Sequence, residues 1–207
     1  MAAIDLRPVA VSVNPARRLP QLLIGLVLYG TSMAMMTRAS LGLSPWDVLH
    51  EGLTKRTGLT FGTAVAIASV VVMLLWIPLR QRPGIGTVAN IVVISFTVDL
   101  VRAVLPEQHA MGWRITLMLG GIVVNGLATA AYVGARLGPG PRDGLMTGLS
   151  ERTGRSVRLV RTGIEIAVLA AGWLLGGSVG VGTVLYALAI GPLAQLFLPM
   201  FAWRERR

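Results

Sequence analysis

Two aspartates, Asp47 and Asp143, occupy the same place in two related segments of this sequence. Each is the third residue of a predicted short helix that begins with a proline, Pro45 or Pro141. An acid at this position can face a substrate path, together with the positive N-terminal ends of two converging helices. It can also cap its own helix and interact favourably with the helix dipole. The two interpretations are compatible, and the sequence leaves both open.

The two segments belong to an internal duplication with a spacing of 96 residues. Residues 41–58 and 137–154 are identical at 10 of 18 aligned positions, and the pairing continues on both sides without a gap. Glycines and prolines that define the repeat motif are Gly42, Pro45, Gly52, Gly138, Pro141 and Gly148. A fixed spacing of this kind indicates a chain built from two copies of one unit.

Residues predicted to line a substrate path are Trp46, Asp47, Asn125, Arg142, Asp143 and Glu165. Glu165 lies inside an apolar stretch, where burial of an ionisable side chain is costly and therefore suggests a function. Arg161 stands four residues earlier and offers a plain ion pair instead. Asn125 can line the path or serve as a hydrogen-bond partner between helices.

The composition places this chain in a membrane. Hydrophobic residues make up 54% and charged residues 14%, with a mean hydropathy of +0.69, whereas soluble domains carry about 25% charged residues. The net charge of +10 comes mainly from arginines at the ends of apolar stretches, where basic residues act as topology signals. We therefore expect membrane lipids as neighbours and no nucleic acid as a partner.

Six apolar stretches are predicted to cross the bilayer, which takes about 20 helical residues. They lie at 19–37, 57–79, 84–105, 115–135 and 162–175, with a last stretch ending near residue 203. A helix over 45–57 would be only about 20 Å long, so it and its copy at 141–153 are predicted to be re-entrant or interfacial. The predicted fold is an all-α membrane protein with two three-helix repeats, each with a short non-spanning helix.

An odd number of spans in each repeat predicts that the two repeats have inverted topology. On this arrangement 14 basic residues fall on one side of the membrane and five on the other. The richer side is expected to be the cytoplasm, so both termini are predicted to be cytoplasmic in a bacterial inner membrane. The predicted organisation is a cytoplasmic tail (1–18), a first repeat (19–106), a second repeat (107–203) and a cytoplasmic tail (204–207).

Signatures of enzymes, metal sites and cofactor sites are missing from the sequence. The two histidines, His50 and His109, form no metal-spaced set, and there is no cysteine. No nucleophile elbow or phosphate-binding loop occurs. We therefore expect no catalytic residue, no metal ion and no cofactor.

One stretch resembles a known family. The run Gly42-Leu43-Ser44-Pro45-Trp46-Asp47-Val48-Leu49-His50 is similar to the motif of the YczE/YitT group of bacterial membrane proteins. The second copy departs from this motif, with Arg142 where Trp46 stands in the first. The resemblance covers most of the chain and implies an integral inner-membrane protein. Relatives in this group are linked to antibiotic or lipopeptide production and are sometimes classed as exporters.

Together these features predict a small secondary transporter or exporter of a small molecule, with its path between the two repeats. One alternative is a scaffold or accessory protein that docks a cytoplasmic partner through a basic face formed by Arg152, Arg155, Arg158 and Arg161. That face is equally suited to anionic lipid. Another alternative is a substrate-binding membrane subunit of a larger uptake complex. Six spans are few for a transporter, which leaves room for a homodimer.

Overall fold

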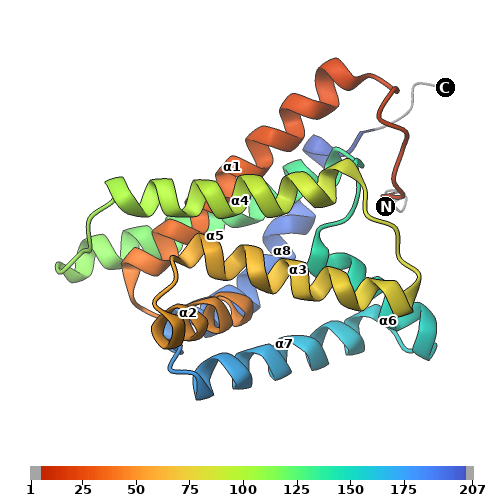
Figure 1. The fold of residues 1–207 in the computed structure, drawn as a ribbon. Coiled ribbons are helices and arrows are strands. Elements are labelled where there is room, and N and C mark those ends of the chain that lie inside the picture. The colour runs from red at the N-terminus through yellow and green to blue at the C-terminus, as the bar shows by residue number, and fades with distance from the viewer. Residues whose placement is uncertain (1–5, 204–207) are drawn as a thin grey trace.

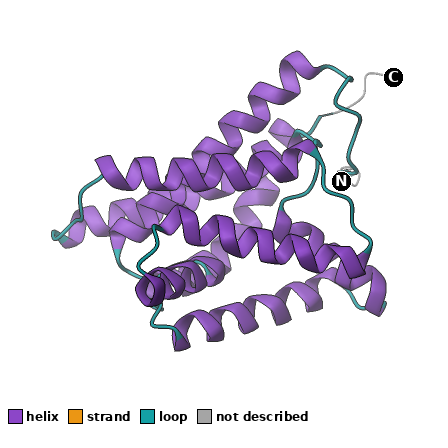
Figure 2. Cartoon of the chain, viewed as in Figure 1, coloured by secondary structure: helices purple, strands orange, loops and turns teal. Residues whose placement is uncertain are grey.

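A computed structural model describes residues 6–203, and all regular structure in this range is helical (Figures 1 and 2). The eight helices are α1 (Pro15–Ala39), α2 (Pro45–Thr57), α3 (Phe61–Leu79), α4 (Ile85–Val104), α5 (Met111–Gly134), α6 (Pro141–Thr153), α7 (Val157–Leu174) and α8 (Val181–Phe201). The all-α prediction is confirmed for this range. Residues 1–5 and the predicted tail at 204–207 lie outside the described residues.

The duplication in the sequence is matched by the positions of the helices. The first residues of α5, α6, α7 and α8 each lie 96 positions after the first residues of α1, α2, α3 and α4. Both predicted short helices are present with the expected bounds, 45–57 and 141–153. The two halves of the chain therefore carry the same succession of helices.

Among residues 6–203, five helices are long and apolar enough to cross a membrane: α1, α3, α4, α5 and α8. The predicted span at 162–175 corresponds to α7, which is not among them. This helix carries Arg158, Arg161 and Glu165 in its first half, so its apolar part is shorter than a bilayer requires. The structure thus supports several apolar spans but does not confirm six.

Helix starts also differ from the expected ends of the spans. α1 begins at Pro15, so the predicted tail at 1–18 includes its first turn. α3 begins at Phe61 because Gly58 ends α2 in the left-handed conformation and Thr60 then caps α3, accepting a hydrogen bond from the backbone N–H of Thr63.

Each short helix packs against a long helix of the other half of the chain. α2 lies along α7, and α6 lies along α3, while α1 and α5 pack together in the centre (Figure 1). Small residues make these contacts possible. A Cβ atom at Gly144 of α6 would lie 2.0 Å from the Trp76 ring, and one at Gly172 of α7 would lie 2.4 Å from the backbone nitrogen of Leu49. The two copies are therefore interlocked and do not fold as separate bundles.

Two arginines tie the copies together in the same reciprocal way. Nε of Arg18 donates to the carbonyl oxygen of Ala135 at the end of α5, at 2.9 Å. Nε of Arg114, its counterpart in the second copy, donates to the carbonyl oxygen of Ala39 at the end of α1, at 2.8 Å. These carbonyls have no partner within their own helices, so the arginines satisfy helix ends. Arg18 is fully buried and has a structural role besides its predicted role as a topology signal.

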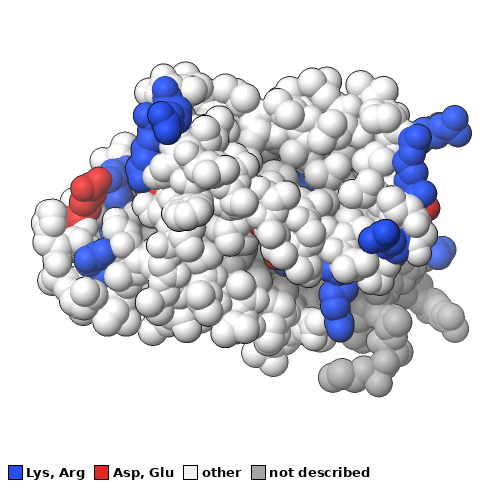
Figure 3. All heavy atoms as spheres, turned by 90° about the horizontal axis from the view of Figure 1, so that it is seen from below, with Lys and Arg blue, Asp and Glu red and all other residues white. Residues whose placement is uncertain are grey.

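The outer surface fits a lipid environment. Seen from below, the charged side chains gather toward the two ends of the molecule, with a broad uncharged surface between them (Figure 3). Large apolar side chains are exposed on the long helices, among them Ile77, Phe96, Leu119 and Leu188. An exposed apolar surface of this extent marks contact with a membrane or a partner.

Candidate functional site

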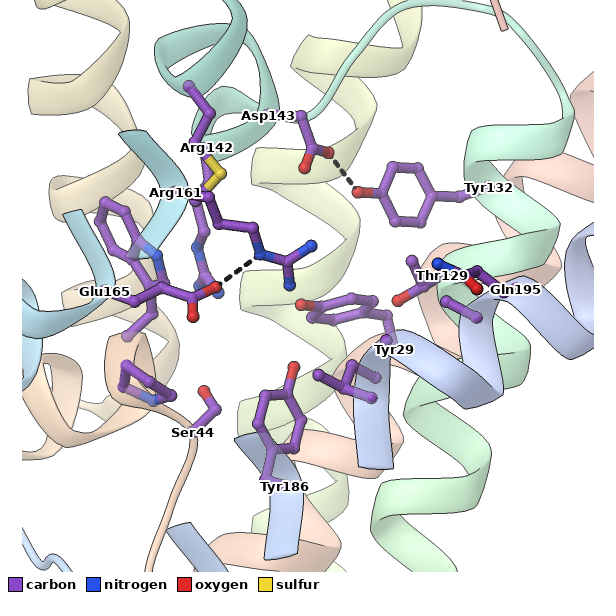
Figure 4. Close-up of a pocket in the computed structure, with 16 residues that line it drawn as sticks. Tyr29, Ser44, Thr129, Tyr132, Arg142, Asp143, Arg161, Glu165, Tyr186 and Gln195 are labelled. Atoms are coloured by element: carbon purple, nitrogen blue, oxygen red, sulfur yellow. Dashed lines mark hydrogen bonds and ion pairs between the residues drawn. The ribbon is translucent and has the colours of Figure 1, made fainter. Parts of the chain in front are cut away.

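A cavity of about 210 Å³ lies where the two halves of the chain meet (Figure 4). The N-terminal ends of the two short helices reach it, with Trp46 from α2 and Arg142 and Asp143 from α6. α7 contributes Arg161 and Glu165, and α1, α5 and α8 close the remaining sides. The cavity is therefore built from both repeats and brings together four of the six residues predicted to line a path.

Arg142 and Trp46 hold equivalent positions in the two copies and stack on each other. The guanidinium carbon of Arg142 lies 5.0 Å from the centre of the Trp46 ring, which is the geometry of a cation–π contact. Within residues 6–203, the guanidinium has no hydrogen-bond or ion-pair partner, although it borders the cavity. The departure of the second copy from the family motif thus supplies an available cation.

Asp143 faces the same cavity. The hydroxyl of Tyr132 on α5 donates a hydrogen bond to Oδ2 of Asp143 at 2.5 Å (Figure 4). The residue at the N-cap of α6 is Gly140, which has no side chain to cap the helix. Trp76 of α3 lies beneath this end of α6 and donates from Nε1 to the carbonyl oxygen of Pro141 at 3.0 Å. Contacts from other helices therefore position Asp143.

Asp47 does not reach the cavity, although its counterpart Asp143 does. It is 2% exposed and accepts hydrogen bonds from Oγ of Ser44 at 2.7 Å and from Nδ1 of His50 at 3.3 Å. Burial tends to raise the pKa of Asp47, but the bonds from His50 and Ser44 and the charge of Arg142 hold it below its ordinary value. Asp47 is therefore a buried carboxylate that organises the start of α2.

His50 completes this buried group. Burial lowers the pKa of His50, and the charge of Arg142 adds to the effect, while the hydrogen bond to Asp47 opposes it. Its Nε2 has no partner among residues 6–203. The neutral imidazole donating from Nδ1 is the form that suits these surroundings.

Asn125 lies behind the cavity wall and not in it. Its amide nitrogen donates to Oγ of Ser32 at 2.7 Å, and its oxygen accepts from the Tyr186 hydroxyl at 3.0 Å. These bonds connect α1, α5 and α8. Of the two roles that the sequence allowed, the structure supports a hydrogen-bond partner between helices, and it adds the positioning of Tyr186 in the wall.

Glu165 and Arg161 form an ion pair on the α7 side of the cavity. Nε of Arg161 lies 2.8 Å from Oε1 of Glu165, and the two side chains are 48% and 29% exposed. The ion pair expected from the sequence is therefore present, and the paired Glu165 also borders the cavity. In Figure 4 the guanidinium of Arg161 points toward the middle of the cavity, near the hydroxyl of Tyr29.

Sequence reasoning missed the tyrosines. The chain contains three, and all of them line the cavity: Tyr29, Tyr132 and Tyr186. A phenol hydroxyl buried among apolar helices needs a hydrogen-bond partner, so a tyrosine within an apolar stretch is a signal that could have been used. Gln195 on α8 and Thr129 on α5 are further polar residues of the lining. As an amide within an apolar stretch, Gln195 could be expected from the sequence to line a path or to bond between helices, whereas Thr129 carried no comparable signal.

The fold and the site define an all-helical membrane protein in which two copies of one unit enclose a polar cavity. Residues 16–199 match the family of unknown function DUF6198, and this chain belongs to that family.

Two relatives illustrate the similarity. An uncharacterised protein of Haemophilus influenzae is 40% identical over 181 residues, covering 87% of this chain and 83% of the relative. The uncharacterised membrane protein YczE of Bacillus subtilis is 36% identical over 178 residues, covering 84% of this chain and 82% of YczE. The resemblance to YczE expected from the motif at residues 42–50 is thereby confirmed. No solved structure was found to match the chain.

Proposed function

We propose that this protein is a small secondary transporter or exporter that carries a small molecule through the cavity between its two repeats. The observation that supports this function best is the meeting of the two short helices. Their N-terminal ends, one from each copy, border the same cavity, which is also lined by two ionisable residues of α7 and by three tyrosines. Interrupted or short helices whose positive ends face a central site are a recurrent arrangement in transporters with inverted repeats.

The proposed topology places the two repeats in opposite orientations in a bacterial inner membrane. α2 and α6 begin at the cavity and run away from it toward different ends of the molecule (Figure 1). The basic residues near the end of α6 assign that end to the cytoplasm, together with both chain termini. The end of α2, near Thr57, then lies on the outer face.

Cysteine accessibility tests this topology, because the chain contains no cysteine of its own. Thr57 and Thr153 are exposed counterparts at the ends of α2 and α6. We expect Thr57→Cys to react with a membrane-impermeant thiol reagent added to whole cells, and Thr153→Cys to react only in inside-out vesicles. Reaction of both cysteines from the same side would exclude inverted repeats.

A second cysteine tests the cavity itself. Thr129 lines the cavity from α5, so Thr129→Cys is expected to react with a small water-soluble thiol reagent. Its matched control is Ala128→Cys, the fully buried neighbour in the same helix, which should stay unreactive. If both positions are equally unreactive in membranes, the cavity is sealed and the transport proposal fails.

The alternative of a scaffold with a basic docking face receives less support. Two of its four predicted arginines are already engaged, since Arg152 donates to the carbonyl oxygen of Pro78 and Arg161 pairs with Glu165. Arg155, which precedes α7, and Arg158, in its first turn, remain exposed. A sealed cavity in the cysteine experiment would favour this alternative.

A further inference from the structure

The two copies differ in how their last two helices meet. In the first copy α3 packs against α4, whereas within residues 6–203 no comparable packing joins α7 to α8. The contact in the first copy is close: a Cβ atom at Gly62 would lie only 2.1 Å from the carbonyl oxygen of Ser95. Asp99 of α4 strengthens it, because its Oδ1 accepts the backbone N–H of Gly62 at 2.7 Å.

The sequence of the second copy explains why this contact is lost. The counterpart of Gly62 is Arg158, and the counterpart of Asp99 is Gln195. Any side chain at the position of Gly62 would collide with the neighbouring helix, so Arg158 prevents the same approach. Gln195 also lacks the charge with which Asp99 stabilises the N-terminal end of α3.

The consequence is a pair of unequal cavities at equivalent places. A small cavity of about 50 Å³ borders Val65 and Ser69 of α3 and Asn90 and Ile94 of α4, and residues of α1, α5 and α6 close its other sides. The counterparts of the named residues, Arg161, Glu165, Tyr186 and Ile190, border the cavity of about 210 Å³. The larger cavity therefore occupies the space that the missing contact between α7 and α8 leaves open.

Gly191 marks the open side. It borders the cavity from α8, and a Cβ atom added there would meet no atom within 4 Å. The helices on either side carry exposed apolar residues: Ile166, Trp173 and Leu174 on α7, and Val184, Leu188 and Leu196 on α8. In a membrane protein such surfaces contact lipid tails, so the opening faces hydrocarbon.

The polar end of the cavity favours an anion. Both acids on its wall already accept hydrogen bonds, Asp143 from Tyr132 and Glu165 from Arg161. The guanidinium of Arg142 makes no hydrogen bond or ion pair among residues 6–203. Trp46, which is 6% exposed and also borders the cavity, contributes its ring, over which the Arg142 guanidinium lies. A guanidinium free of hydrogen bonds within that range, next to two helix N-termini, suits a carboxylate or phosphate group.

We propose that the cavity binds an amphiphilic anion, with its carboxylate or phosphate group at Arg142 and its apolar chain leaving between α7 and α8. The ligand enters sideways from the bilayer through the opening at Gly191. This inference rests on the proposed transport function and names the class of its substrate.

Binding of spin-labelled probes in phosphatidylcholine nanodiscs tests the proposal. The probes are spin-labelled stearic acid, its uncharged methyl ester, and a spin-labelled phosphatidic acid. We expect a protein-bound, motionally restricted signal for at least one anionic probe and not for the ester. Unlabelled long-chain anion should displace it at concentrations at least about tenfold lower than butyrate or inorganic phosphate, because each buried methylene adds affinity.

Matched variants locate the two ends of the ligand. Arg142→Gln should weaken binding about tenfold or more, and Arg142→Lys, which keeps the charge, should recover part of that loss. Arg155→Gln, which changes an exposed arginine outside the cavity, should bind as wild type. Gly191→Leu should weaken the long-chain probes and spare butyrate. Gly163→Leu is its control, because Gly163 of α7 is equally open but does not border the cavity.

Three outcomes would overturn the proposal: no restricted signal from either anionic probe, equal binding of acid and ester, or displacement by butyrate as effective as by stearate. The last result would assign a water-soluble anion to the cavity and remove the lateral route. None of these outcomes bears on the labelling of Thr57→Cys, Thr153→Cys and Thr129→Cys, so a failed ligand class and a failed transport function are distinguishable.

Discussion

Arg142 lies over the ring of Trp46, 5.0 Å from its centre, and the two residues are counterparts 96 positions apart. Counterparts that touch each other lie at the junction of the two copies, as residues on a twofold axis do. The two copies therefore differ at their point of contact. Identical residues at these two positions would place either two cations or two aromatic rings against each other. The divergence provides an aromatic surface from one copy and a charge from the other.

The first prediction concerns this contact. Trp46→Leu and Arg142→Gln should each lower the free energy of unfolding, and a double-mutant cycle should give a coupling energy of about 0.5–2 kcal/mol, as for a partly desolvated cation–π pair. Unfolding in detergent micelles, followed by circular dichroism, provides the measurement. Additive effects of the two substitutions would show that the contact contributes nothing.

The second prediction concerns Arg18. Its fully buried guanidinium donates to several backbone carbonyls, including those of Ala10 and Ala135. Arg18→Ala would leave these acceptors without their charged donor, so we expect a loss of at least about 3 kcal/mol. Arg17→Ala is the matched control, because Arg17 is the exposed neighbour. Equal melting temperatures of the two variants would contradict the structural role of Arg18.

The third prediction concerns the packing of α6 on α3. Gly144→Ala would place a Cβ atom 2.0 Å from the Trp76 ring, and we expect it to destabilise the protein by about 1–3 kcal/mol. Trp76→Phe should recover part of this loss in the double variant, since the smaller ring leaves room. Gly163→Ala, at a position with open space, should instead be neutral or stabilise by up to about 1 kcal/mol.

The fourth prediction concerns pH. Burial holds the pKa of His50 below its ordinary value of 6.5. As the pH falls below this value, His50 is therefore protonated more readily in the unfolded chain than in the folded protein. The stabilising contribution of the neutral, buried imidazole is fully present above pH 6.5 and is lost as the pH falls below that value. The folded pKa of Asp47 is also lowered, which adds a further loss at more acidic pH, beginning near its ordinary value of 3.8.

Thermal unfolding of His50→Gln and His109→Gln between about pH 7 and pH 5 measures the histidine effect, in the range below the unfolded pKa. His50→Gln should reduce the dependence of stability on pH, whereas His109→Gln, which changes an exposed histidine, should leave it as in wild type. An unchanged slope in His50→Gln would show that His50 is not the group that resists protonation.

Much of the local structure was determined by the sequence itself. Pro45 and Gly58 set the ends of α2, and their counterparts Pro141 and Gly154 set those of α6, because proline suits a first helical turn and glycine adopts the left-handed conformation at little cost. The duplication predicted that every helix would occur twice. Composition alone placed the chain in a membrane.

The tertiary structure decided what each counterpart does. Asp47 and Asp143 are the same residue in the same helical position, yet Ser44 and His50 enclose one, while Tyr132 and the cavity receive the other. The sequence does show that Ser44 and His50 are replaced by Gly140 and Met146 in the second copy. It does not show that one aspartate is buried while the other borders a cavity, because that depends on how the helices of both copies pack. The three tyrosines likewise become one site only when α1, α5 and α8 meet.

The open side of the cavity was likewise determined partly by the sequence and partly by the tertiary structure. Arg158 and Gln195 are visible in the sequence as departures from Gly62 and Asp99, but their meaning depends on the contact between α3 and α4. Only the folded chain shows that Gly62 must lack a side chain for two helices to touch. A repeat in the sequence therefore predicts helices with matching bounds. The packing distances between helices decide where the two copies differ in their contacts.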